Sequence, residues 1–71
     1  MFDRITFEPG KMGGRACIRG MRITVALIVS QIAQGATVAE LLDEYPSLEA
    51  EDIQQALEYV AWLAREEVYP A

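Results

Sequence analysis

Three arginines near the start of the sequence are its strongest candidates for a functional contact. Arg15, Arg19 and Arg22 lie in a segment punctuated by glycines, so that their side chains can reach outward from tight turns. A guanidinium group is planar and permanently charged, and it pairs bidentately with a carboxylate or a phosphate. The alternative is that these are scattered surface arginines without a common partner. We take the three side chains as candidate contacts to a partner protein or to a nucleic acid.

The other polar residues give little sign of catalysis or metal binding. The chain contains no histidine and a single cysteine, so the usual pairs of nucleophile and base, and the usual zinc ligand sets, lack their parts. Glu40 and Glu44 are one helical turn apart, and Glu51, Asp52 and Gln55 lie on one side of a later helix. Carboxylates in this pattern can hold a divalent ion, but they far more often form a solvated helix face. The sequence predicts a protein that is not an enzyme and that needs no metal or cofactor.

Two further features have a structural explanation beside a chemical one. Gly13 and Gly14 could present backbone amides to an anion, but the lysine and hydroxyl residue of a phosphate-binding loop are absent, which favours a turn. Cys17 could be a redox sensor, but its place in a short apolar run is more typical of a small core residue. One cysteine forms no disulfide within the chain, and the sequence shows neither a signal peptide nor an apolar run of ~20 residues. We expect a cytoplasmic protein without a membrane segment.

A short β element is expected to position the arginines. Residues 5 to 7 and 16 to 18 have the pattern of short strands. Gly20 can adopt a positive φ without a steric penalty, and a tight reversal there would pair the second strand with Ile23. Residues 1 to 24 are therefore predicted to form a basic β-hairpin or β-arm.

Three helices are predicted to follow: from residue 25 to a stop at Gly35, over residues 37 to 45, and over residues 50 to 66. Thr24 is a suitable N-cap for the first helix. Thr37 and Glu40 have the spacing of a capping box at the start of the second, which ends before a proline. Apolar residues recur three and four positions apart in each helix and predict one shared core. The expected core stripes are Val25, Ile28, Val29 and Ile32; Val38, Leu41, Leu42 and Tyr45; and Ile53, Leu57, Val60 and Ala64.

Length and composition fit one small domain of the mainly α class. We predict a helix-turn-helix-like, three-helix domain over residues 25 to 66, with the β-arm before it and a tail at residues 67 to 71. Apolar residues make up 52% of the chain and charged residues 24%, which is the balance of a globular domain. A chain of 71 residues removes only about 60% of its unfolded surface from water. We expect its stability alone to be marginal.

The last helix carries a second apolar stripe that a three-helix core does not need. Tyr59, Trp62 and Leu63 lie on a different side from the core stripe, and Tyr69 follows shortly after the helix. These residues could be buried against the β-arm, or they could form an interface, because aromatic residues are enriched at binding hot spots. They are the candidate contacts to a second copy or to a partner protein, and we expect a dimer or a hetero-complex.

The second and third predicted helices have the spacing of a helix-turn-helix unit, whose second member would enter the major groove of DNA. Charge argues against this. Residues 1 to 24 carry five basic and two acidic side chains, whereas residues 25 to 71 carry one basic and nine acidic ones. Three acids between residues 49 and 52 would face duplex phosphates, and Gln54 or Gln55 cannot offset that repulsion. A DNA-binding transcriptional regulator stays open as the alternative, with weak DNA affinity expected from the chain alone.

The combined pattern resembles a family of small prokaryotic proteins known as domain of unknown function 433. The resemblance runs from Ile5 to Ala61. The matching residues are Gly13-Gly14-Arg15, Cys17-Ile18-Arg19-Gly20, Arg22-Ile23, Val25, Gly35, residues 40 to 42, Tyr45-Pro46, Asp52-Ile53 and Ala56-Leu57.

This resemblance implies a function as well as a fold. Many members of the family are regarded as antitoxins of toxin-antitoxin systems, paired with a nuclease-like toxin of the PIN type. The resemblance therefore implies that the chain binds and neutralises such a toxin. A PIN-like toxin would present an acidic metal-binding pocket, into which an arginine of the β-arm could be inserted.

Overall fold

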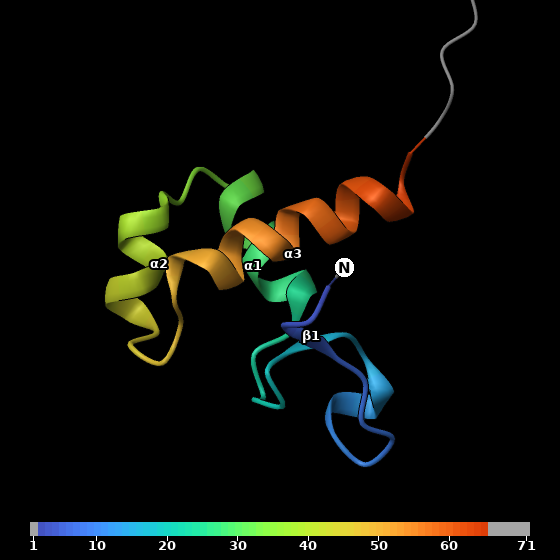
Figure 1. The fold of residues 1–71 in the computed structure, drawn as a ribbon. Coiled ribbons are helices and arrows are strands. Elements are labelled where there is room, and N and C mark those ends of the chain that lie inside the picture. Colours follow the sequence, from blue (N-terminus) through green and yellow to red (C-terminus); the bar gives the residue numbers. More distant parts are fainter. Residues whose placement is uncertain (1, 66–71) are drawn as a thin grey trace, which may run out of the picture.

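Three helices packed beside a two-stranded β element form the part of the chain that the structure describes, residues 2–65 (Figure 1). The structure is a computed structural model. In chain order its elements are β1 (Ile5–Thr6), a 3-10 turn (Met12–Gly14), β2 (Cys17–Ile18), α1 (Val25–Ala33), α2 (Val38–Glu44) and α3 (Ala50–Leu63). The expectation of a mainly helical fold with a short N-terminal hairpin is confirmed.

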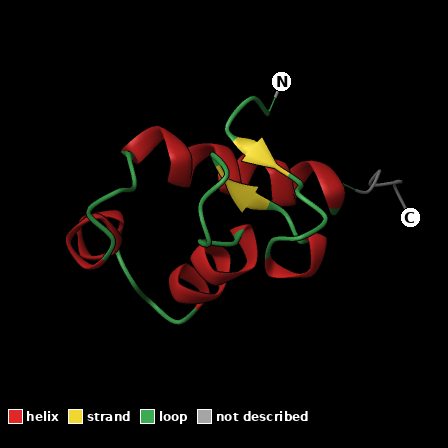
Figure 2. Ribbon diagram, turned by 90° about the horizontal axis from the view of Figure 1, so that it is seen from below, coloured by secondary structure: helices red, strands yellow, loops and turns green. Residues whose placement is uncertain are grey.

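The two strands are antiparallel, with Ile5 opposite Ile18 and Thr6 opposite Cys17. Figure 2 shows them side by side against the helices. A further bridge joins Cys17 to Thr24, directly before α1. The β-arm is therefore tied to the start of the helical part through β2.

A tight turn follows β2 and contains Arg19, one of the three candidate arginines. The backbone N–H of Met21 donates to the carbonyl of Ile18 (2.8 Å), and both central residues have positive φ, 45° at Arg19 and 72° at Gly20. Two central residues of positive φ are typical of the hairpin turn whose twist matches the flanking strands. The predicted reversal at Gly20 is confirmed. The left-handed backbone at Arg19 is uncommon for a residue with a side chain.

The helix ends follow the sequence signals closely. The hydroxyl of Thr24 accepts a hydrogen bond from the N–H of Leu27 (3.0 Å) at the start of α1, and Gly35 has φ 102° just after its end. Thr37 and Glu40 exchange the two capping-box hydrogen bonds at the start of α2, at 2.9 and 3.1 Å. The predicted starts and stops of α1 and α2 are confirmed to within a residue or two, whereas α3 ends at Leu63, before its predicted end at residue 66.

The core lies between the three helices and the strands, and two of the predicted core positions are wrong. Val38 is 42% exposed because it stands in the first turn of α2, at the edge of the helix packing. Ala64 is exposed because α3 ends at Leu63, in a stretch that projects past α1 in Figure 1. The buried core consists of Ile5, Ile18, Val25, Ile28, Leu41, Leu48, Ile53 and Ala56.

Candidate functional site

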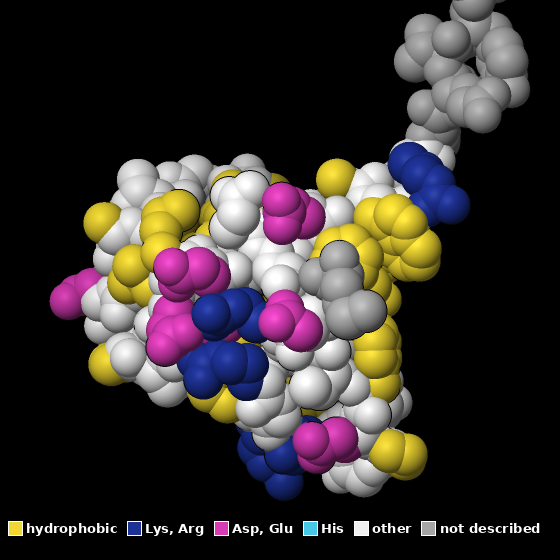
Figure 3. Space-filling model, in the orientation of Figure 1, with side chains coloured by type: hydrophobic (Ala, Val, Ile, Leu, Met, Phe, Trp, Pro, Cys, Tyr) yellow, Lys and Arg dark blue, Asp and Glu magenta, His cyan; other side chains and the backbone are white. Residues whose placement is uncertain are grey.

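A buried ion-pair cluster joins the β-arm to the start of α3. Asp52 is fully buried, and its carboxylate accepts hydrogen bonds from Nε (3.0 Å) and Nη2 (2.8 Å) of Arg19 and from Nη1 of Arg4 (2.8 Å). The backbone N–H of Glu49 donates a fourth (2.8 Å). Figure 3 shows basic and acidic side chains gathered at the centre of this face. We call Arg4, Arg19, Glu49 and Asp52 the Asp52 cluster. It holds together three segments that are far apart in the sequence.

The prediction of a solvated face at Glu51, Asp52 and Gln55 is correct only for Glu51. Asp52 has no exposed surface, because α3 begins beneath the β-arm and its first turn is covered by arginines. Gln55 accepts a hydrogen bond from the backbone N–H of Arg4 (2.6 Å) and donates one to Asp3 (2.9 Å). These polar residues position the β-arm on the helix.

Arg19 has an internal role that the sequence pattern did not reveal. Besides its two hydrogen bonds to Asp52, it donates one to the carbonyl of Ser47 (2.8 Å), and its side chain is 36% exposed. Arg4, which sequence reasoning passed over, pairs with both Asp52 (2.8 Å) and Glu49 (2.7 Å). The sequence did offer one signal for these ion pairs, because basic side chains are concentrated in residues 1 to 24 and acidic ones in the rest of the chain. A partner contact by Arg19 stays a prediction.

The arginines also control the ionisation of the buried carboxyl. Burial by itself would raise the pKa of Asp52, but the hydrogen bonds from Arg19, Arg4 and the backbone of Glu49 outweigh it and lower the pKa to about 2. Asp52 is therefore ionised at neutral pH. A buried carboxylate paired in this way orders the fold and is poorly placed to take up a proton in catalysis.

All three candidate arginines are exposed, but Arg15 and Arg22 differ from Arg19 because neither makes an ion pair or side-chain hydrogen bond with the residues 2–65 that the structure describes. Lys11, by contrast, pairs with Glu8 (3.1 Å). Of the three candidate arginines, Arg15 and Arg22 thus keep their charge available to a partner. The sequence grouped the three arginines together, whereas in the described part of the chain only Arg19 uses its side chain in hydrogen bonds within the domain.

The second apolar stripe of α3 is covered only in part by the β-arm. The ring of Phe2 packs against Tyr59 (centroids 5.3 Å apart) and Trp62 (5.7 Å), and Phe7 approaches Tyr59 (6.2 Å). Nevertheless Trp62 is 48% exposed, and Phe7 and Leu63 are each 58% exposed. Burial of this stripe against the β-arm is thus confirmed in part, and an interface at these residues stays a prediction. We call Phe7, Tyr59, Trp62 and Leu63 the aromatic face; Tyr69, the fourth predicted interface residue, lies outside the described residues.

Beside the aromatic face lies an apolar groove of about 370 Å³ with one charged residue in its lining. Its walls come from the β-arm, the first turn of α1 and the last turns of α3. We call it the Arg15 groove. Its lining residues are Phe7, Gly14, Arg15, Ala16, Val25, Ala26, Tyr59, Val60 and Leu63.

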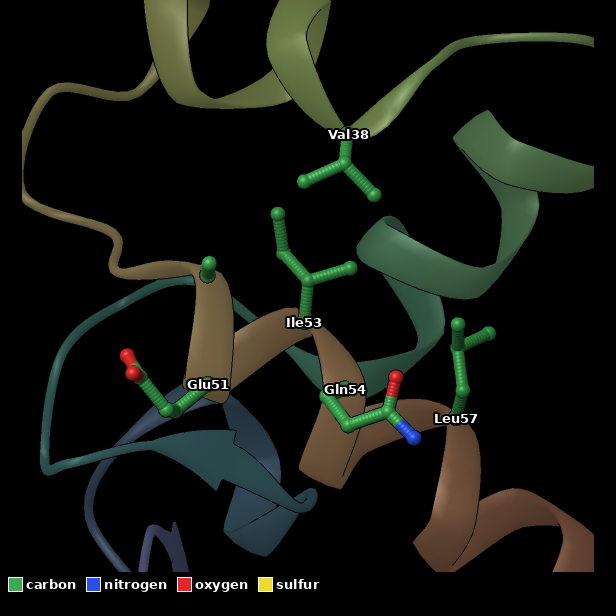
Figure 4. A pocket seen from close by; sticks show the side chains of 6 residues that line it. Val38, Glu51, Ile53, Gln54 and Leu57 are labelled. Carbon is green, nitrogen blue, oxygen red and sulfur yellow. The ribbon is translucent and has the colours of Figure 1, made fainter.

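A different hollow lies between the start of α2 and α3. It is lined by Val38, Ala50, Glu51, Ile53, Gln54 and Leu57. Figure 4 shows Val38 and Ile53 pointing toward each other, while Glu51 and Gln54 extend from the outer side of α3. Glu51 is exposed at this hollow, and its carboxylate would repel the phosphates of a nucleic acid brought close to it.

Three smaller sequence features can be placed as well. Cys17 is buried, as expected for a small core residue, and Gly13 and Gly14 lie in the 3-10 turn with φ 69° and 78°. Within residues 2–65 no three acidic or cysteine side chains gather as a metal site would require. None of the helices described is long and apolar enough to cross a membrane.

Comparison with known proteins places the chain in a family. Residues 5–60 match the family described as "Protein of unknown function (DUF433)". An uncharacterized protein of Sinorhizobium fredii, y4eO, is 36% identical over 55 residues, which cover 78% of this chain and 25% of that protein.

A crystal structure of a DUF433 member protein from Anabaena variabilis superposes with a TM-score of 0.81 and 43% identity, over 84% of this chain and 59% of that one. The chain thus spans a quarter of the first relative and over half of the second. The segment matched by the family begins after Arg4 and includes Arg19, Asp52 and Tyr59. The chain belongs to the DUF433 family of proteins of unknown function.

Proposed function

We propose that this domain is an antitoxin-like binding module that neutralises a PIN-like nuclease toxin through its aromatic face. The observation that carries the proposal is the exposure of Phe7, Trp62 and Leu63, at 58%, 48% and 58%, on one side of a domain of 71 residues. Contiguous exposed apolar side chains of this size are typical of a protein-binding surface. The toxin class comes from the family resemblance.

The exposed arginines are also suited to binding an acidic surface of the toxin. Arg15 lines the groove beside the aromatic face and makes no ion pair with the described residues, so it can pair with a carboxylate of the toxin. Arg22 is exposed as well and can add long-range attraction to an acidic surface. Arg19 already makes three hydrogen bonds within the domain, two to Asp52 and one to the carbonyl of Ser47. We therefore assign the toxin contact to Arg15 ahead of Arg19.

The rigid part of the module is the Asp52 cluster. It fixes the β-arm, and with it Phe7 and Arg15, relative to α3. A preorganised surface loses less conformational entropy when it binds. The ion pairs at Asp52 thus favour binding indirectly, because they order the surface that contacts the toxin.

Co-expression in bacteria with the product of an adjacent gene tests the proposal. The wild-type chain should restore growth and co-purify with that product. Leu63→Asp, which places a charge on the aromatic face, should fail in both respects while keeping a native circular dichroism spectrum. Gln54→Asp, a charge of the same kind on the far side of α3, should behave as wild type. Growth rescue by the Leu63→Asp chain, or failure of the wild-type chain to capture a partner and restore growth, would contradict the proposal.

A further inference from the structure

We propose that the Arg15 groove is a receptor for an acidic segment of the partner protein, which inserts one apolar side chain and pairs an adjacent carboxylate with Arg15. The proposal deepens the proposed function and rests on it for the identity of the partner. Its structural basis is a groove whose charge and shape are matched by one kind of ligand.

The apolar part of the ligand follows from the lining. The volume of about 370 Å³ is enough for one aromatic or large aliphatic side chain. Ala16, Val25 and Ala26 line the groove from the β-arm and α1, and Tyr59 and Leu63 line it from α3, so that most of its lining is apolar. A polar side chain here would lose its hydrogen bonds to water without replacement.

The acidic part follows from the charges around the groove. Arg15 is the single charged residue in its lining, and the neighbouring hollow at Trp62 and Leu63 contains Arg65, whose guanidinium lies 5.0 Å from the ring of Trp62. No aspartate or glutamate lines either hollow in the described part of the chain. The rest of the helical surface is rich in carboxylates, as the net charge of −5 requires. A basic, apolar site on an acidic protein selects an acidic, apolar ligand.

A second copy of this chain fits the groove less well. An isologous pairing of two aromatic faces brings Arg15 and Arg65 of one copy toward the same cations of the other, and like charges at an interface are costly. We therefore assign the groove to a different protein.

A pair of small probes tests the groove without the partner. The ligands are 3-phenylpropanoate and its neutral amide, 3-phenylpropanamide, titrated into the ¹⁵N-labelled chain and followed by NMR. The carboxylate should shift the resonances of groove residues such as Ala16 and Ala26, with a dissociation constant on the order of a few millimolar. The amide should bind about threefold more weakly, because it lacks the ion pair with a partly solvated arginine.

Matched variants make the result specific. Arg15→Gln should remove the preference for the carboxylate and leave the affinity for the amide unchanged. Arg22→Gln, which neutralises an exposed arginine that does not line the groove, should keep the preference. Equal affinities for the two probes in the wild type, or a preference that survives in Arg15→Gln, would overturn the proposal whether or not a toxin is found.

Sedimentation of the wild type supplies the second arm of the test. A dimer that forms with rising concentration and is lost in Leu63→Asp would assign the groove to a second copy and would also overturn the proposal. A monomer that binds the carboxylate probe supports it.

Discussion

Arg19 donates two parallel hydrogen bonds, 3.0 and 2.8 Å long, to the carboxylate of Asp52, which lies 33 positions later in the sequence. The geometry depends on the turn, because the left-handed backbone of Arg19 (φ 45°) sends its side chain from the β-arm to the start of α3. Arg4 approaches the same carboxylate at 2.8 Å. One buried acid thus holds two parts of the β-arm against the start of α3, and several consequences can be measured.

Removal of the charge at the centre of this cluster should be strongly destabilising. Asp52→Asn leaves Arg4 and Arg19 without their shared partner and should lower the free energy of unfolding by about 2 to 4 kcal/mol, since both arginines are partly solvated. Urea denaturation followed by circular dichroism measures this. Glu51→Gln, an exposed position one residue earlier in the same helix, is the matched control and should change stability by less than about 0.5 kcal/mol. Similar losses in the two variants would show that the cluster contributes little.

Stability should depend on pH through the same group. The ordinary pKa of an aspartate is 3.8 and that of Asp52 in the fold is lowered to about 2, so the unfolded chain binds the proton more tightly. The cluster's contribution should be fully present above pH 4 to 5 and should be lost as the pH falls toward 2. Urea midpoints at several pH values give the slope. Asp52→Asn should flatten it in this window, and an unchanged slope would mean that other carboxyl groups cause the acid sensitivity.

The bidentate geometry at Arg19 should distinguish arginine from lysine. Arg19→Lys keeps the charge but cannot make two parallel hydrogen bonds to Asp52 and a third to the carbonyl of Ser47, so it should lose about 1 to 2 kcal/mol of stability. Arg22→Lys, which changes a side chain without such contacts, should be neutral. Thermal unfolding of the pair decides the point; equal melting temperatures would contradict the structural role of Arg19.

DNA affinity of the isolated chain should be weak and driven by charge. Glu51 on the exposed side of α3 repels phosphates, while Arg15 and Arg22 are exposed and make no ion pair with the described residues. A gel-shift series should therefore show binding that fades with salt and weakens in Arg15→Ala/Arg22→Ala, with no effect of Gln54→Ala. Tight, sequence-specific binding that depends on Gln54 would instead favour the transcriptional regulator.

The sequence predicts the helices of this fold well because their signals are local. Thr24, Thr37 and Glu40 cap helices within three residues of themselves, and Gly35 and Pro46 end them. The turn at Gly20 is equally local. These features need no knowledge of the distant parts of the chain.

The candidate site is less predictable because it depends on long-range packing. Nothing local distinguishes Arg19, which is paired with Asp52, from Arg15 and Arg22, which are exposed. The burial of Asp52 likewise follows from the β-arm lying over α3, and its helical spacing alone indicated a solvated face. The exposure of Trp62 depends on how far α3 extends past α1, which periodicity does not specify.

The dissociation constant of the complex with the co-purified toxin is the most direct test of the aromatic face. Calorimetric titration should compare the wild type with Trp62→Ala, and with Arg22→Ala as a surface control. Truncation of a tryptophan at the centre of an interface costs on the order of 2 to 4 kcal/mol, so Trp62→Ala should bind roughly 30- to 1000-fold more weakly. Arg22→Ala should mainly slow association at low salt. A folded Trp62→Ala chain that binds the toxin with wild-type affinity would contradict the account.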